Sequence, residues 1–468
     1  MNTPFLGGPR RKPVSSRSTT SGEKVDRRWY YLGFGLLLAS ILLHLPLLVV
    51  CGLLLLLVLC TTDIWAHYCL HTLHYQRHLS ERQALFGEEI TLSVSVENAK
   101  LLPLPWLELE DMFPRALNVK GQQLYTGLRS NQVLLECLFS PRWYERVTRR
   151  YTVQCNSRGI HIFGPTILRS GDVFGFIKRE MHIPERQYLL IYPLVVPLSS
   201  FKLPARHPFG DQRAPRRLLE DPSRVIGVRD YAYGDSLRRV HWKATARTMQ
   251  LQSKVYEATT TYTLILFLNI SSQFDAYYGI HPELQELAIC AGASVTDWAI
   301  NQGYAVGLYA NSIMFMPDEG TLTDMVQDQD QDLDAQLSSQ MRRRRIRLPA
   351  SSSEEQRKRI MEALARIQSY FGTSIEDVML AERSRLPAGA TVVLITNTIT
   401  ESIVDTLARI RQGGHAVTIL FVGDTPPPIK LAGVSIYHLG GEETWEHLKA
   451  AHISAQEQAV ESIPAFHL

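Results

Sequence analysis

The hydrophobic pattern opens with a long apolar stretch at residues 32–60. One membrane-spanning helix needs about 20 apolar residues, so this stretch is too long for one span and short for two. Trp29 and Tyr68 flank it with aromatic rings, which prefer the membrane–water interface, and Pro46 lies near its midpoint. We therefore predict a transmembrane helical hairpin over residues 29–66, with one kinked span as the alternative.

Four histidines follow the apolar stretch at spacings of four, three and four: His67, His71, His74 and His78. This spacing predicts one face of a juxtamembrane helix at 67–83. A transition-metal site and a pH sensor are possible interpretations. Because no carboxylate is mixed into the stripe to orient the rings, we favour the polar face of an interfacial helix.

Residues 84–200 change to short segments in which polar and apolar positions alternate, as at Glu89–Val96. A period of two is typical of half-buried strands, and glycine, proline and asparagine separate the segments. We predict a β-sandwich-like domain here that serves as a structural scaffold. Further strands are expected at 106–109, 132–139, 151–153 and 188–192.

A different pattern fills residues 261–455, where continuous apolar runs alternate with helical segments. Such alternation predicts an α/β domain with a doubly wound sheet and helices on both faces. Strands are expected at 262–268, 304–309, 391–396, 416–421 and 434–438, and helices at 282–301, 354–370, 400–412 and 442–452. Residues 456–468 form a C-terminal tail.

Charge adds an orientation to this plan. Residues 1–28 are rich in Ser, Thr, Pro and Arg, and we expect a disordered basic tail. Positive flanks stay in the cytoplasm, so a hairpin returns the soluble part to the cytoplasm, whereas one span exports it. The net charge of +3 over 468 residues does not suggest a nucleic-acid-binding polycation, and the six cysteines form no spacing framework.

The densest group of ionisable and aromatic residues lies at 227–247, inside a segment, 201–260, that we interpret as a linker and a charged motif. These charges must pair with one another or with a partner, because unpaired burial is costly. One alternative is an enzyme that uses Asp235, His241 and Lys243 as acid, base and charge stabiliser. No phosphate-binding loop, zincin motif or serine-hydrolase motif accompanies them.

This motif, GVRDYAYGDSLRRVHWKATAR, closely resembles the signature of the bacterial family called domain of unknown function 58. The matching residues of the signature include Arg229, Tyr231, Gly234, Asp235, Arg238, His241, Trp242, Lys243 and Arg247. The resemblance implies a two-pass protein of the bacterial inner membrane, with a β-region and a von Willebrand factor type A-like domain. It also implies association with a MoxR-type AAA+ ATPase and a transglutaminase-like membrane protein, without an established enzymatic activity.

Type A domains can carry a metal site beyond the first strand, built on Asp and Ser. Here Asn269 and Asn397 stand at the two carboxylate positions, beside Ser271. Because hard divalent cations prefer anionic oxygens, we interpret this edge as a degenerate metal site and expect no metal or cofactor.

An insertion at 318–352 carries a run of aspartates and then a run of arginines, and we expect a solvated loop. Binding of anionic lipid or nucleic acid through residues 341–347 is an alternative function. Our preferred hypothesis is a membrane-anchored, non-enzymatic adaptor that docks protein partners.

Overall fold

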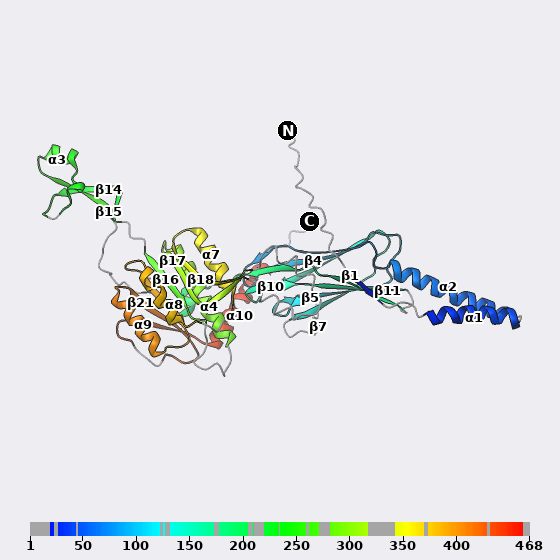
Figure 1. The fold of residues 1–468 in the computed structure, drawn as a ribbon. Coiled ribbons are helices and arrows are strands. Elements are labelled where there is room, and N and C mark those ends of the chain that lie inside the picture. The colour runs from blue at the N-terminus through cyan, green and yellow to red at the C-terminus, as the bar shows by residue number, and fades with distance from the viewer. Residues whose placement is uncertain are drawn as a thin grey trace, which may run out of the picture. The chain divides into compact units, whose positions relative to one another are not determined.

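The computed structural model describes residues 19–22, 27–43, 45–121, 125–126, 132–172, 177–204, 209, 220–233, 235–258, 262–270, 281–316, 342–368, 373–427 and 431–461. They divide into two compact units. The first extends to Tyr192, and the second begins at Pro193 (Figure 1). The insertion at 318–341, Gly234 and Ser271 lie outside the described residues.

Two apolar helices begin the first unit, α1 (Arg27–Leu43) and α2 (Pro46–Tyr68). They pack side by side (Figure 1), and the Tyr30 hydroxyl of α1 donates to the carbonyl of Leu59 in α2 over 3.2 Å. Within α2, the 20 residues of Pro46–Trp65 are long and apolar enough to span a membrane. The shorter helix α1 leaves the two-pass topology a prediction.

The expected juxtamembrane helix at 67–83 is wrong. Helix α2 ends at Tyr68, and strand β2 begins at Leu73 and runs to Leu79. His74 and His78 therefore project from a strand, and His71 lies in the intervening turn. The segment forms a strand that pairs with β4 rather than a helix, because alternate residues of β2 are buried in the core. The four histidines do not share one helical face.

The middle of the chain is a β-domain of three sheets, antiparallel apart from the pairing of β13 with β3. A six-stranded sheet has the order β1, β12, β11, β5, β8, β7, which are Thr19–Gly22, Lys178–Ile183, Thr166–Gly171, Leu107–Pro114, Gln132–Phe139 and Tyr125–Thr126. A four-stranded sheet has the order β2, β4, β9, β6, of which β4 is Glu89–Asn98, β9 Arg146–Gln154 and β6 Asn118–Val119. The third sheet has the order β10, β13, β3, which are Gly159–Phe163, Gln187–Ile191 and Gln83–Ala84.

Strand β1 corrects part of the expectation for the basic tail. Thr19–Gly22 pairs with β12 at the edge of the six-stranded sheet, in register from Thr19 opposite His182. An edge strand presents unpaired backbone groups that recruit a further strand, and β-branched threonines suit that conformation. Part of the segment expected to be disordered is thus ordered by the β-domain.

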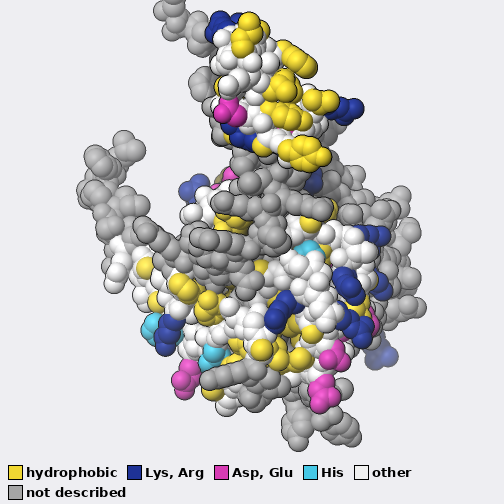
Figure 2. All heavy atoms as spheres, turned by 90° about the vertical axis from the view of Figure 1, so that its left-hand side faces the viewer, with side chains coloured by type: hydrophobic (Ala, Val, Ile, Leu, Met, Phe, Trp, Pro, Cys, Tyr) yellow, Lys and Arg dark blue, Asp and Glu magenta, His cyan; other side chains and the backbone are white. Residues whose placement is uncertain are grey.

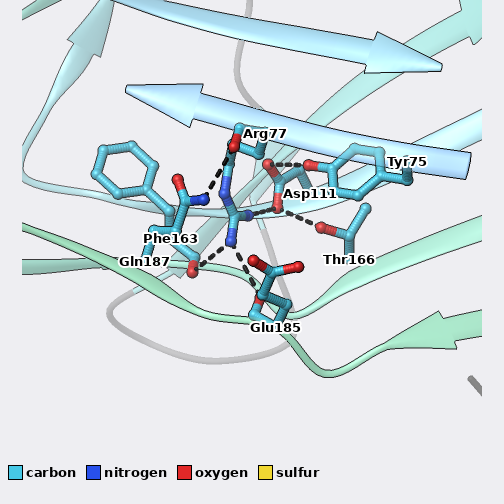
Figure 3. A network of polar contacts seen from close by, with 7 residues as sticks. All are labelled: Tyr75, Arg77, Asp111, Phe163, Thr166, Glu185 and Gln187. Carbon is cyan, nitrogen blue, oxygen red and sulfur yellow. Dashed lines mark hydrogen bonds and ion pairs between the residues drawn. The ribbon is translucent and has the colours of Figure 1, made fainter. Parts of the chain in front are cut away.

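One buried polar network holds the β-domain together (Figure 3). The Arg77 guanidinium of β2 donates to Asp111 of β5 over 2.6 Å, and both side chains are at most 2% exposed. Arg77 also donates to the carbonyls of Phe163 and Glu185, each over 3.0 Å. Because buried charges are costly unless paired, this pair fixes how β2 packs against the other sheets.

Hydroxyl groups complete the network around the Asp111 carboxylate. Thr166 donates to it over 2.8 Å and Tyr75 over 3.1 Å, so three side chains share one buried anion. Burial, followed by the charge of Asp111, raises the pKa of Tyr75, which therefore stays a protonated donor.

The second unit is built on a six-strand path in the order β18, β17, β16, β20, β21, β22. The pairs from β17 through β22 along this path are parallel, which confirms a doubly wound sheet with the first strand in the middle. The strands are Arg342–Ser351, Ala305–Met316, Thr263–Leu268, Thr391–Thr396, Ala416–Val422 and Ser435–Gly440, and β19 (Ile367–Gln368) pairs with β17.

The main helices of this unit lie near their expected positions. They are α4 (Pro282–Asn301), α7 (Glu354–Ala365), α9 (Glu401–Gln412) and α10 (Glu442–Glu461), joined by the unexpected α8 (Ile375–Glu382). Helix α10 runs past the expected domain end at residue 455. The 3-10 turns η1 (Leu198–Phe201) and η3 (Arg383–Arg385) complete the described elements outside the charged motif.

The arginine run does not form a loop where the structure describes it. Residues 342–351 form the edge strand β18, with Ile346 fully buried and Arg345 exposed. Arg347 pairs with Glu382 of α8. Long charged side chains suit an edge strand, because they keep a further strand from adding to the sheet.

Candidate partner-binding surface

The charged motif forms a small module, which we define as residues 220–258. Strands β14 (Glu220–Asp230) and β15 (Gln252–Ala258) pair in antiparallel fashion. Between them lie the 3-10 turn η2 (Leu237–Arg239) and helix α3 (Trp242–Thr248). The motif is therefore a strand, a turn and a short helix that returns to the partner strand.

Asp235 organises the turn after β14. Its Oδ1 accepts from Arg229 over 2.7 Å, its Oδ2 accepts from the backbone N–H of Ala232 over 3.1 Å, and its carbonyl accepts from the Tyr231 hydroxyl over 2.7 Å. The hydrogen bond from Arg229 lowers the pKa of the Asp235 carboxyl, which keeps it ionised. This carboxylate thus serves the conformation of the turn.

His241 and Thr245 connect helix α3 to strand β15. The Nδ1 of His241 accepts from the backbone N–H of Ala244 over 3.0 Å, so the histidine caps the helix and its proton lies on Nε2. The backbone N–H of Gln252 donates to the Thr245 hydroxyl over 3.0 Å, and that of His241 donates to the Gln252 carbonyl over 2.7 Å. These motif residues hold the module in shape.

A second group of module residues points into solvent and is apolar. In the upper part of Figure 2, yellow hydrophobic side chains lie beside dark blue Lys and Arg side chains. Tyr233 is fully exposed and Trp242 is 68% exposed, although such rings are usually at least partly buried. Among the described side chains of the module, the other large apolar ones that are exposed are Val225, Val228, Leu237, Met249 and Leu251.

Cations surround these apolar side chains. Arg238, Lys243 and Arg247 are exposed, and their side chains form no ion pair with any residue that the structure describes. The motif therefore divides into an inward set that holds the fold and an outward set that is apolar and basic. An exposed apolar patch ringed by polar groups is typical of an interaction site.

The expected degenerate metal edge lies at the switch point of the doubly wound sheet, where β16 and β20 are neighbours. Asn269 donates to the Thr396 hydroxyl over 3.0 Å and accepts from the Asn311 amide over 2.8 Å. The Asn311 oxygen accepts from the N–H of Ile270 over 2.8 Å. These amides are committed to bonds that tie the ends of β16 and β20 to the interior of β17, and Asn397 follows directly after β20.

Asn311 belongs to this edge but lay outside the sequence reasoning. Its position inside β17, a strand longer than expected, is what brings it beside Asn269. Among the described residues, no group of three or more His, Cys, Asp or Glu side chains is placed to hold a metal ion.

The module lies mostly within the segment that matches a known protein family. Residues 227–327 match the family model described as "Protein of unknown function DUF58". The chain is also similar to the "Uncharacterized protein YeaD" of Bacillus subtilis (strain 168), with 25% identity over 245 residues. That alignment covers 52% of this chain and 57% of YeaD, so the chain spans little more than half of this relative. Both findings support the family resemblance that the motif indicates.

Solved structures resemble the chain only weakly. The CARDB domain of a Pyrococcus furiosus protein, solved with di-metal ions, is 7% identical with a TM-score of 0.17, over 25% of this chain and 86% of that chain. The DNA glycosylase AlkC of Pseudomonas fluorescens is 12% identical with a TM-score of 0.17, over 25% of this chain and 29% of that chain. Likeness at this level says nothing about function.

Proposed function

We propose that this protein is a membrane-anchored adaptor without enzymatic activity, whose module at 220–258 docks a protein partner. One observation carries the proposal: the motif uses its inner residues to present Tyr233 and Trp242 to solvent beside free cations. Tyr, Trp and Arg are the residues that most often dominate the free energy of protein–protein binding. The basic rim fits a partner surface that is acidic around an apolar pocket.

The geometry also bears on the enzyme alternative. Both carboxylate oxygens of Asp235 accept hydrogen bonds within the module, and the Nδ1 of His241 is used by the helix cap. A general acid or base needs a free proton-transferring atom directed at a substrate. These commitments favour a structural role for Asp235, whereas His241 keeps its Nε2 outside the cap; the engaged carboxylate supports the adaptor proposal.

Family resemblance supplies the partners that we propose, a MoxR-type AAA+ ATPase and a transglutaminase-like membrane protein. A cytoplasmic ATPase requires the module to be cytoplasmic, so we propose two spans, α1 and α2, with the basic N-terminal flank inside. We further propose a von Willebrand factor type A-like fold for the doubly wound domain. Its strand order, with a central first strand, supports this proposal.

Matched variants of the module test partner docking. Trp242→Ala and Arg238→Ala remove outward groups, whereas Lys254→Ala changes a half-buried cation on β15 as the control. We expect the first two to weaken capture of the purified ATPase by at least about tenfold, as for residues that dominate an interface, and the control to leave it unchanged. Full binding by both outward variants would contradict the proposal.

A reporter fused after Leu468 tests the topology separately. A cytoplasmic signal is expected from two spans, and a periplasmic signal would require one span and would exclude a cytoplasmic ATPase as the partner.

A further inference from the structure

Helix α2 enters the β-domain without a flexible linker. Trp65 packs against the hydrophobic core of that domain, and the next residues, Cys69 and Leu70, are buried in it. Only four residues separate the last residue of the helix, Tyr68, from the first residue of β2, Leu73. The end of the apolar helix is therefore a fixed part of the β-domain, and neighbouring loops hold a defined position next to it.

Lys100 fastens one such loop to the end of the helix. Its ammonium group donates to the carbonyl of Cys69 and, over 2.8 Å, to that of His71. The backbone N–H of Ala99 donates to the carbonyl of Thr72 over 3.2 Å. A lysine on the carbonyl of the C-cap residue, Cys69, also compensates the negative end of the helix dipole.

A second loop is tied to the first. The N–H of Tyr144 donates to the carbonyl of Lys100 over 3.3 Å, and the Asn98 amide donates to the carbonyl of Arg142 over 2.9 Å. Tyr144 adopts the left-handed conformation, with φ of 51°, which bulky residues rarely do. A backbone in this conformation favours glycine, yet the loop carries a large aromatic side chain there.

The two loops expose three large apolar side chains next to the end of α2. Leu101 is 74% exposed, Trp143 63% and Tyr144 66%, whereas the rest of the strand pair β4–β9 directs its apolar residues inward. Arg142 adds an exposed cation beside them. Trp and Tyr, with a nearby Arg, are the residue types that lie at the lipid headgroup level.

We infer that the loops 99–105 and 140–145 form a docking edge that inserts Leu101, Trp143 and Tyr144 into the lipid interface. The inference rests on the proposed membrane anchorage through α2. Continuity with the anchor selects lipid as the occupant, because the loops are bonded to the backbone immediately beyond the apolar helix. The β-domain then lies directly on the membrane with a fixed orientation.

Depth along α2 agrees with this placement. At 1.5 Å per residue, the 20 residues of Pro46–Trp65 cover about 30 Å, the thickness of the hydrocarbon core. Cys69 lies four residues beyond Trp65, about 6 Å further along the axis, at headgroup depth. Lys100 and the backbone of Tyr144 are one and two hydrogen bonds from that point.

Fluorescence of the full-length protein in vesicles of phosphatidylethanolamine and phosphatidylglycerol tests the inference. Subtracting the emission of the Trp143→Phe variant from that of the parent isolates Trp143 among the seven tryptophans. Trp242→Phe isolates a tryptophan of similar exposure, 68% against 63%, in the module at 220–258. Lipids with a nitroxide on the headgroup then quench whichever ring lies at the interface.

We expect the Trp143 signal to lose most of its intensity with the nitroxide lipid, and the Trp242 signal to lose a smaller fraction. Equal losses, or an unquenched Trp143, overturn the docking edge. Alkaline carbonate extraction of the same vesicles separates the two levels of the argument. Protein that resists extraction with an unquenched Trp143 leaves the anchor standing without the edge, whereas extracted protein removes the proposed anchorage and the edge together.

Discussion

Replacing Arg77 with methionine removes a buried cation from the centre of the β-domain while keeping the length of the side chain. The change deletes donors to the Asp111 carboxylate and to the carbonyls of Phe163 and Glu185. Thr166 and Tyr75 still donate to Asp111, so the anion keeps two of its three side-chain donors. Breaking one side of a buried ion pair costs about 3–5 kcal/mol, and we expect a loss of that size.

A second ion pair of equal length provides the control. Arg146 and Glu97 are also 2.6 Å apart, but they bridge neighbouring strands of one sheet and their side chains are 55% and 37% exposed. Arg146→Met is expected to cost about 0.2–1 kcal/mol, because solvent screens exposed pairs. The two variants then differ in the burial of the ion pair and in the two carbonyls that only Arg77 binds.

Hydrogen exchange of the full-length protein in detergent measures both variants. In Arg77→Met, protection of the amides of β2 and β5 should fall about a hundredfold to several thousandfold, given that about 1.4 kcal/mol corresponds to a factor of ten. The Arg146→Met variant should stay within about fivefold of the parent. Equal losses of protection in the two variants would refute the argument from burial.

Three further predictions concern single residues. Burial lowers the pKa of His161. Below pH about 6.5 the unfolded chain therefore takes up a proton at this histidine, whereas the native β-domain does not. The contribution to the free energy of unfolding is complete above that pH and falls by up to about 1.4 kcal/mol per pH unit below it. Exchange of β10 amides between pH 7 and 5 should show this loss. It should vanish in His161→Gln but persist in His182→Gln, which changes a histidine whose side chain is 45% exposed. Gly171→Ala places a Cβ 2.0 Å from the Ile177 carbonyl oxygen and 2.9 Å from the Trp106 ring. We expect the free energy of unfolding to fall by about 1–3 kcal/mol, measured as faster amide exchange in β11 and β12. The control is Gly227→Ala, whose Cβ meets nothing within 4 Å, and equal protection in both variants would disprove the clash. Asp235→Ala should release the turn after β14 and speed exchange at Ala232, whereas Arg238→Ala should leave that exchange unchanged; a protected Ala232 amide in the aspartate variant would show that the turn holds without it.

Hydrophobic pattern alone located most of the second unit. Strand 391–396 and helix 282–301 have the bounds expected, because a continuous apolar run marks a buried strand and a proline at the first helical position marks a helix start. Helix α8 was not predicted, although the sequence carries a signal for its start: Ser374 caps it by accepting from the backbone N–H of Asp377. The arginines of β18 concealed a strand, because charge at an edge position resembles a solvated loop.

The segment after α2 shows why local spacing fails. The histidines fit a helix, yet Leu73, Tyr75 and Leu79 alternate with polar residues as a strand requires. Arg77 is the inward residue that hides this alternation, since its burial depends on Asp111, far along the sequence. For the module, the motif located the surface, but the division into inward and outward residues required the hydrogen bonds of the folded chain.

Strand β1 connects the start of α1 to the same β-domain that holds the end of α2. Gly22 is held at the edge of the six-stranded sheet, and α1 begins at Arg27, five residues later, so the chain between them reaches at most about 18 Å. Helix α2 is anchored in the same β-domain through Trp65. Both helices are thus tied to the same β-domain, so α1 cannot begin more than about 18 Å from the edge of the sheet without separating β1 from β12.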